Sequence, residues 1–187
     1  VLNCGSSSIK FAVFSLENNK HIYHGIIDNI NNDNCHLSYT AHGILCGKHI
    51  RGKSTHDALF TIINLIKQDK DICNKLVAIG HRVVHGGNDF KQSTIISKEN
   101  IINLKKTITL APLHNPANIL GIEQCLLAFP NLKNIAVFDT AFHARMPNLA
   151  STYAIDPDIA NKYGIKKYGF HGINHNYVYD EVCKLMG

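Results

Sequence analysis

The feature that most constrains the fold is a change of hydrophobic period near residue 55. Before that point, short runs such as residues 9–16 and 21–30 alternate apolar and polar side chains. Such runs, separated by Asn- and Asp-rich segments, are typical of neighbouring strands joined by turns. After that point, apolar residues recur at helical spacing, and short, fully apolar runs lie between the helical segments. This order predicts an α/β fold, with a sheet of mixed direction and flanking helices.

The same patterns give approximate bounds for the elements. Strands are expected at residues 9–16, 21–30, 36–40 and 44–51, with a turn at 17–20 and a loop at 29–34. A helix capped by Ser54 or Thr55 follows, and residues 58–66 form its apolar face. Beyond it we predict a buried strand at 76–79, a helix opened by residues 97–100, a helix from Pro116 to Ala128, a strand at 135–138 and a helix at 178–186.

Composition and charge exclude several classes of protein. Among 187 residues, 45% are hydrophobic and 18% are charged, as in folded globular proteins. The net charge is +5, but the basic residues are scattered rather than gathered on one segment, so no nucleic-acid partner is expected. The six cysteines form no C-x-x-C pair, and neither a signal peptide nor a membrane-spanning run is present. These features predict a reducing, cytoplasmic compartment and no membrane partner.

The first segment with groups suited to catalysis is the turn at residues 3–10. It contains Asn3, a glycine, three serines and Lys10 between two apolar runs. Backbone N–H groups, the hydroxyls of Ser6 and Ser8 and the Lys10 ammonium can together hold a phosphate. The alternative is an ordinary Gly-Ser turn, because no Walker loop is present.

The second segment, residues 80–87, places Arg82 between His81 and His85. We expect it just after a buried strand, where open α/β sheets bind their ligands. The guanidinium of Arg82 suits bidentate binding of carboxylate or phosphoryl oxygens. For both histidines, a hydrogen-bonded structural role is the favoured interpretation.

Two further segments join strands to helices. In residues 110–116, two prolines fix a connection that can present Leu113 to a pocket, and the ordinary interpretation of Asn115 is a helix cap. In residues 137–143, Asp139 ends an apolar strand, a position suited to binding magnesium or orienting a substrate. A lone aspartate at a strand end is also a common turn or capping residue.

The fifth segment, residues 168–172, has glycines on both sides of Phe170 and His171. The imidazole can donate to an oxyanion, and the phenyl ring can line an apolar pocket. Metal binding by His171 and His175, four residues apart, is the competing hypothesis, although neither an H-E-x-x-H motif nor a third ligand lies nearby.

In this order, the five segments resemble acetate kinase, and the closely similar propionate kinases, over essentially the whole chain. The resemblance is carried by N-x-G-S-S-S-I-K-F at 3–11, G-H-R-V-V-H-G-G at 80–87, A-P-L-H-N-P at 111–116, F-D-T-A-F-H at 138–143 and Y-G-F-H-G at 168–172.

This resemblance implies a ribonuclease-H-like lobe of the sugar kinase, heat-shock chaperone and actin superfamily at residues 1–143. Residues 144–187 would then begin a second, nucleotide-binding lobe. It also implies roles for particular side chains. Expected in catalysis are Arg82, Asp139 and His171; around the substrate, Arg82, Val84, Leu113 and Phe170; on the phosphate and ATP side, Ser6, Ser8 and Lys10; and at magnesium, Asn3 and Asp139.

The implied activity is reversible phosphoryl transfer from ATP to acetate, giving acetyl phosphate and ADP on the way to acetyl-CoA. ATP, Mg²⁺, a cytoplasmic location and a homodimer belong to that expectation. Two alternatives stay open: propionate kinase, or a non-catalytic fragment that binds an acyl group or phosphate. We expect the opening strand to lack its first residues and the chain to stop before the nucleotide site, so that these 187 residues alone are inactive.

The sequence departs from the family pattern at two places. Residues 171–175 read H-G-I-N-H where the family usually has H-G-T-S-H, and Ala144-Arg145 stand where Gln-Thr is common. Both changes concern contacts near the phosphates and leave the charged residues in place.

Overall fold

A single mixed sheet organises the computed structural model, which describes residues 1–50 and 54–187. The sheet has eight strands in the order β5-β4-β3-β2-β1-β6-β8-β7. The strands are β1 Leu2–Cys4, β2 Ile9–Phe14, β3 His21–Asp28, β4 His36–Ala41, β5 Ile44–His49, β6 Ala78–Val83, β7 Thr94–Ile96 and β8 Lys133–Phe138. This architecture confirms the predicted α/β fold class.

The direction of the strands changes in the middle of the sheet. Strands β1 to β5 form an antiparallel meander, as the closely spaced turns of the first part predict. Strands β1, β6 and β8 are parallel neighbours, and β7 runs antiparallel to β8 at the edge. The carboxyl ends of the three parallel strands therefore lie side by side, where open sheets bind ligands.

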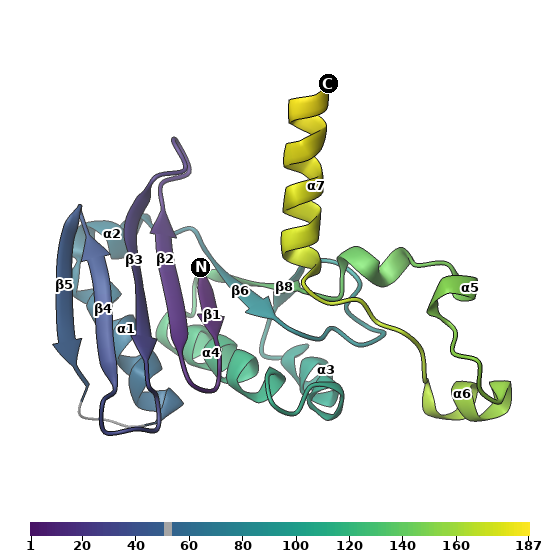
Figure 1. Ribbon diagram of the computed structural model, residues 1–187. Helices are drawn as coiled ribbons and strands as arrows, with labels where there is room; N and C mark the ends of the chain where they lie inside the picture. Colours follow the sequence, from purple (N-terminus) through teal and green to yellow (C-terminus); the bar gives the residue numbers. More distant parts are fainter. Residues whose placement is uncertain (51–53) are drawn as a thin grey trace.

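The helices before β8 connect strands of the sheet, and those after it continue the chain beyond the last strand (Figure 1). They are α1 Thr55–Gln68, α2 Lys70–Lys75, α3 Ile101–Lys105, η1 Lys106–Leu110, α4 Asn115–Ala128, η2 Phe142–Arg145, α5 Asn148–Ser151, α6 Pro157–Tyr163 and α7 Gly172–Met186. Helices α1, α2 and α4 lie behind the sheet in Figure 1, whereas α7 projects away from it. Among the described residues, no helix combines the length and apolar character needed to cross a membrane.

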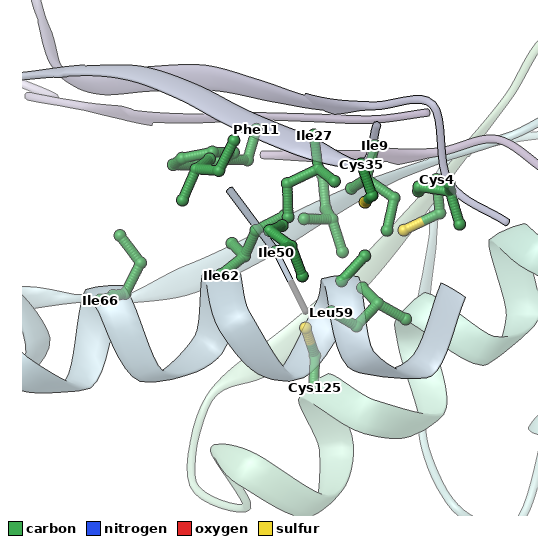
Figure 2. Packing of buried hydrophobic residues seen from close by; sticks show 14 of the residues in the cluster. Cys4, Ile9, Phe11, Ile27, Cys35, Ile50, Leu59, Ile62, Ile66 and Cys125 are labelled. Atoms are coloured by element: carbon green, nitrogen blue, oxygen red, sulfur yellow. The ribbon is translucent and has the colours of Figure 1, made fainter. Parts of the chain in front are cut away.

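The main core lies between the meander and helix α1. Figure 2 shows Phe11 and Ile27 of the sheet facing Leu59 and Ile62 of α1, with Cys125 of α4 beside them. Both Ile27 and Leu59 are 0% exposed, because alternate strand residues point to the helical layer and meet the apolar stripe of α1. A second cluster packs α3 and α4 against the parallel strands, with its fully buried members at Val83, Leu104, Ile122 and Ala136.

The start of α1 forms as the sequence predicts. Ser54 accepts a hydrogen bond from the backbone N–H of Asp57, and the Asp57 carboxylate in turn accepts from the backbone of Ser54. This reciprocal capping box satisfies N–H groups that the first helical turn leaves free. The predicted strand at 44–51 ends earlier, at His49, and its last predicted residue, Arg51, lies outside the described residues.

Several predicted bounds are wrong. The strand expected at 76–79 runs instead from Ala78 to Val83, because parallel pairing with β8 continues to the end of that segment. Helix α7 begins at Gly172 rather than at 178, and strand β7 has no counterpart among the predicted elements. The three residues of β7 are too few for alternation to indicate a strand.

The predicted helix opening at 97–100 is confirmed, but the predicted cap at Asn115 is wrong. Asn100 is the N-cap residue of α3, which begins at Ile101, and the Ser97 hydroxyl accepts from the N–H groups of Glu99 and Asn100 in the turn before it. Asn115 is the first residue of α4, after the N-cap position, and its side chain is completely buried. Its amide bonds to other segments of the chain and therefore does not cap its own helix.

Helix α4 approaches the sheet closely at Gly121. A Cβ added at this position would lie 2.5 Å from the Cys4 sulfur in β1, so the Cys4 side chain, the helix or the strand must shift to accept it. We expect Gly121→Ala to lower the free energy of unfolding by about 1–3 kcal/mol, the usual cost of overpacking a core. Leu127→Ala, at a position of the same helix that is 68% exposed, is the matched control.

Urea denaturation of the two variants and the unchanged protein measures this effect. A stability of Gly121→Ala equal to that of the unchanged protein would show that the contact with Cys4 relaxes without overpacking the core.

Candidate active site

The register of the sheet places three of the predicted site residues on one face. Asn3 pairs with Lys10 across β1 and β2, and the parallel pairing of Leu2 with His81 sets Asn3 beside Arg82. Successive residues of a strand point to opposite faces. Leu2 and His81 are buried toward the helical layer, so Lys10, Asn3 and Arg82 share the opposite face, which those helices leave uncovered.

An ion pair between Arg82 and Asp139 lies at the centre of the candidate site. The Arg82 guanidinium donates from Nε to Oδ1 of Asp139, at 3.1 Å, and from Nη2 to Oδ2, at 2.6 Å. Nη1 donates to the Asn3 side-chain oxygen at 3.4 Å. The three residues come from β1, from β6 and from the position after β8, three neighbouring strands of the sheet. Arg82 therefore lies inside its strand, not just after it as the sequence predicted.

The exposure of the pair leaves one partner available to a ligand. The Asp139 side chain is 3% exposed, and that of Arg82 is 36% exposed. A guanidinium has five N–H donors, and the three bonds described above leave about two of them free. The hydrogen bonds to Asp139 raise the pKa of Arg82 further, so it remains a fixed cation. A buried carboxylate thus orients a cation whose free edge is able to meet an anion.

The turn at residues 5–8 carries the predicted phosphate-side groups. Its backbone is closed by the Gly5 N–H donating to the Ser8 carbonyl at 2.8 Å. A second segment braces it, since the Ile30 N–H donates to the Ser7 carbonyl at 3.0 Å. The side chains of Ser6 and Lys10 are exposed and that of Ser8 is partly exposed. Because Lys10 lies across from Asn3, this turn adjoins the Arg82 cluster.

Buried polar side chains fix the backbone of the loop after β6, and sequence reasoning did not predict this role for them. Asn118 accepts from the Val84 N–H at 3.0 Å, Asn115 accepts from the His85 N–H at 3.1 Å, and the Thr140 hydroxyl accepts from the Gly86 N–H at 3.1 Å. A signal for the two asparagines was available. They stand at i and i+3 on the helix face that also buries Ile122 and Cys125, where a polar side chain needs partners.

Both histidines of this region have the structural role favoured from the sequence. His81 is buried and bonds from Nε2 to the Asn134 side-chain oxygen at 2.8 Å. Burial lowers the pKa of His81 to about 4, so the ring is neutral near pH 7. His85 accepts from the Gly87 N–H at 2.9 Å, and its ring packs against Tyr168 and Phe170. Burial also lowers the pKa of His85.

The segment that carries His171 is fixed to the end of β8. The Gly172 N–H donates to the Asp139 carbonyl at 2.8 Å, and a side chain at residue 172 would collide with that carbonyl. A glycine at this position therefore lets α7 begin against the ion-pair cluster. His171 itself has the left-handed φ of +55°, which is uncommon for a residue with a side chain. This backbone conformation and an exposed side chain are compatible with a functional role.

The residues predicted for an alkyl pocket lie around the same loop. The Phe170 ring centroid is 5.6 Å from that of His85, the residue next to Val84. The Phe170 side chain is 41% exposed, and Leu113, in the connection before α4, is 76% exposed. A shared pocket of Val84, Leu113 and Phe170 therefore stays a prediction.

The chemistry of the donor set bears on the predicted magnesium ion. Asn3 and Asp139 present hard oxygen atoms, which Mg²⁺ prefers, and a carboxylate has more lone pairs than the two that Arg82 uses. The oxygen type therefore suits magnesium, but Asp139 is 3% exposed and both of its oxygens accept from Arg82, so Asn3 is the more accessible of the two. No group of three or more His, Cys, Asp or Glu side chains suited to a metal is found in residues 1–50 and 54–187, which leaves the His171 and His175 hypothesis without a third ligand.

Comparison with known proteins gives consistent results. The acetokinase family matches residues 1–187. The acetate kinases of Baumannia cicadellinicola and Francisella tularensis are 44% and 41% identical to the chain, each over 100% of it and 48% of their own length. The chain thus spans about half the length of the curated relatives it matches.

Solved structures agree with these matches. A propionate kinase from Francisella tularensis has a TM-score of 0.92 at 41% identity, over 99% of this chain and 48% of that one. Porphyromonas gingivalis acetate kinase has a TM-score of 0.87 at 35% identity, over 100% of this chain and 48% of that one. Together with the mixed sheet and its flanking helices, this likeness confirms the predicted fold class, the ribonuclease-H-like lobe of the actin superfamily. The division at residues 143 and 144 stays a prediction.

Proposed function

Because the chain belongs to the acetokinase family, we propose that it is the N-terminal part of an acetate kinase. The reaction is reversible phosphoryl transfer from ATP to acetate, giving acetyl phosphate and ADP. The observation that carries this proposal is the Asp139-oriented guanidinium of Arg82 at the carboxyl edge of three parallel strands. This arrangement offers a fixed cation to a small, doubly anionic reacting pair, a carboxylate and a phosphoryl group.

The chemistry requires positioning more than proton transfer. A carboxylic acid titrates near pH 4, so acetate is already ionised at neutral pH and needs no strong general base. A carboxylate oxygen attacks the γ-phosphorus, and the bond from that phosphorus to the bridging oxygen of ADP breaks. Negative charge spreads over the equatorial oxygens as this occurs, and cations stabilise it most strongly in the transition state.

In this proposal each side chain has a separate task. Arg82 directs its free N–H groups at the carboxylate and the transferring phosphoryl group, while Asp139 holds the guanidinium in place. His171 donates to an equatorial oxygen. The exposed turn with Ser6, Ser8 and Lys10 binds on the phosphate side, supported by its position beside Asn3.

The family also supports ATP as the phosphoryl donor, and we propose Mg²⁺ as its companion ion. The residues of this chain that would hold the ion are Asn3 and Asp139, directly or through water. Bound there, Mg²⁺ would neutralise charge on the phosphate oxygens. A homodimer and a cytoplasmic location are proposed on family membership alone.

Two other functions remain candidates. The likeness to a propionate kinase structure supports a longer acyl substrate, because the same residues would surround it. A non-catalytic protein that binds an acyl group or phosphate is the candidate from a different class, but the complete Arg82–Asp139 ion pair favours catalysis.

The test uses a full-length protein that contains this chain, supplied with ATP, magnesium and acetate. Hydroxylamine traps any acyl phosphate as a coloured hydroxamate. We expect product that depends on all three components. Binding of acetate and ATP without product would favour the non-catalytic alternative.

Substrate length provides a separate prediction. A small pocket of Val84, Leu113 and Phe170 should favour acetate, tolerate propionate and reject butyrate. One methylene in an apolar pocket changes the transition-state energy by about 1–3 kcal/mol. The value of kcat/KM should therefore fall by roughly 10- to 200-fold between the longest acid that fits the pocket and the next longer one. Steady-state kinetics with the three acids measures this series. Equal efficiency for all three, or a preference for butyrate, would contradict the small pocket.

A further inference from the structure

One buried side chain bridges the two loops that the proposed reaction brings together. The Asn118 amide, 3% exposed, donates from Nδ2 to the Cys4 carbonyl at 2.6 Å and accepts from the Val84 N–H at 3.0 Å. Cys4 ends β1 just before the turn with the serines, and Val84 begins the loop after β6. A single amide therefore spans the phosphate side and the carboxylate side of the site.

The chemistry of the two partners fixes the orientation of this amide. Only the nitrogen donates to a carbonyl, and only the oxygen accepts from an N–H. Both bonds exist only with the amide in this one orientation, which neither an aliphatic side chain nor an ionised carboxylate can reproduce. A buried amide satisfied at both ends is also costly to remove, because each backbone group would lose its partner.

The packing of α4 permits this bridge. Gly121 lies one turn after Asn118 and lets the helix approach Cys4 without a side chain in between. A wider helix-to-strand distance would place the amide beyond hydrogen-bonding reach of the Cys4 carbonyl. The glycine and the asparagine therefore lie one turn apart on the buried face of α4 that meets β1.

We propose that Asn118 is a positioning residue of the phosphoryl-transfer reaction, setting the distance between the phosphate-binding turn and the Arg82–Val84 segment. The proposal rests on the proposed function. It assigns Asn118 no contact with substrate; the residue acts through the two backbone segments that it joins. Its loss should change transfer efficiency and discrimination between acids, because both depend on where Val84 stands relative to the phosphate.

The first variant is Asn118→Leu, which keeps the approximate volume of the side chain and makes neither bond. In a full-length protein containing this chain, we expect kcat to fall about 10- to 100-fold, since displacement of about 1 Å can cost that much. The ratio of kcat/KM for acetate over butyrate should also change by at least about threefold. That ratio does not depend on how much of the protein is folded.

Asn134→Leu is the matched control. Asn134 is also a fully buried amide, but its bonds go to the His81 ring and to the Leu132 carbonyl, and neither bond joins the Cys4 carbonyl to the Val84 N–H. It should reduce stability and leave the acetate-to-butyrate ratio unchanged. An unchanged ratio in Asn118→Leu, whatever its stability, would overturn the proposal.

If the leucine variant does not fold, Asn118→Asp tests whether the hydrogen bonds of residue 118 support the reaction. A protonated carboxyl can donate to the Cys4 carbonyl and accept from the Val84 N–H, whereas a carboxylate only accepts. Burial raises the pKa of a carboxyl group above its ordinary value of about 3.9. Activity of this variant relative to the unchanged protein should therefore rise severalfold as the pH is lowered from about 8 to about 5.5. A flat ratio would overturn the role of the donor.

The unchanged full-length protein separates this proposal from the proposed function. Failure to form acetyl phosphate would remove both. Formation of product by the unchanged protein, together with unaffected Asn118 variants, would remove the positioning role alone.

Discussion

Arg82→Ala in a full-length protein containing this chain should reduce kcat for acetyl phosphate formation by about 100- to 1000-fold. Removal of a single transition-state donor typically costs this much, and here the donor is also the only cation that the structure pairs with Asp139 among the described residues. Arg82→Lys should recover little, because an ammonium cannot meet both carboxylate oxygens and still present a second edge to the substrate. Steady-state kinetics with saturating acetate and ATP measures the effect.

Two controls separate this catalytic loss from misfolding. Lys98→Ala removes an exposed cation in the turn before α3 and should leave kcat unchanged. Arg82→Ala also leaves the carboxylate of Asp139 buried without its partner, which is destabilising. The double variant with Asp139→Asn removes that charge and should regain thermal stability while staying inactive. Recovery of turnover in the double variant would mean that Arg82 merely neutralises Asp139.

The second large effect concerns the 187 residues on their own. We expect them to form no measurable acetyl phosphate from ATP and acetate, a loss of more than about 1000-fold relative to a full-length protein. The chain spans about half the length of its curated relatives. Closure of the two lobes aligns the reactants and excludes water, which accounts for much of the rate of two-lobed kinases. One half of the cleft alone should therefore lose most of this rate enhancement.

The measurement is hydroxylamine trapping with the purified chain, magnesium, ATP and acetate, beside the full-length protein. A thermal unfolding transition would confirm that the chain is folded in the assay. Arg82→Ala in the same chain is the control for contaminating kinases. Product that disappears in this control would show that the 187 residues hold the nucleotide themselves.

The sequence alone was sufficient to predict most of the strands and the helix α1 in the first half of the fold. Alternation in residues 9–49 requires strands, because a shift of one residue would turn every apolar side chain to the solvent. The apolar stripe and capping box of α1 depend only on residues a few positions apart. Element bounds were wrong where tertiary contacts decide them, since parallel pairing with β8 extends β6 to Val83.

The site shows the same division between local and distant information. The residue types and their order already indicated phosphoryl chemistry, because a fixed cation, a carboxylate, an imidazole and a glycine-serine turn are the groups that such chemistry uses. Sequence alone left Asp139 open between a metal ligand, a turn residue and a cap. The structure pairs it with Arg82, 57 positions away in the chain.

What the amino-acid sequence determined by itself is therefore the local structure and the inventory of reactive groups, since hydrophobic period, capping and residue chemistry operate over a few neighbouring positions. The tertiary structure alone decided which groups meet. Sheet register aligns Asn3 with Arg82, and the close approach of α4 at Gly121 lets Asn118 reach Cys4, 114 positions away. Such contacts depend on the packing of whole elements, which no local pattern encodes.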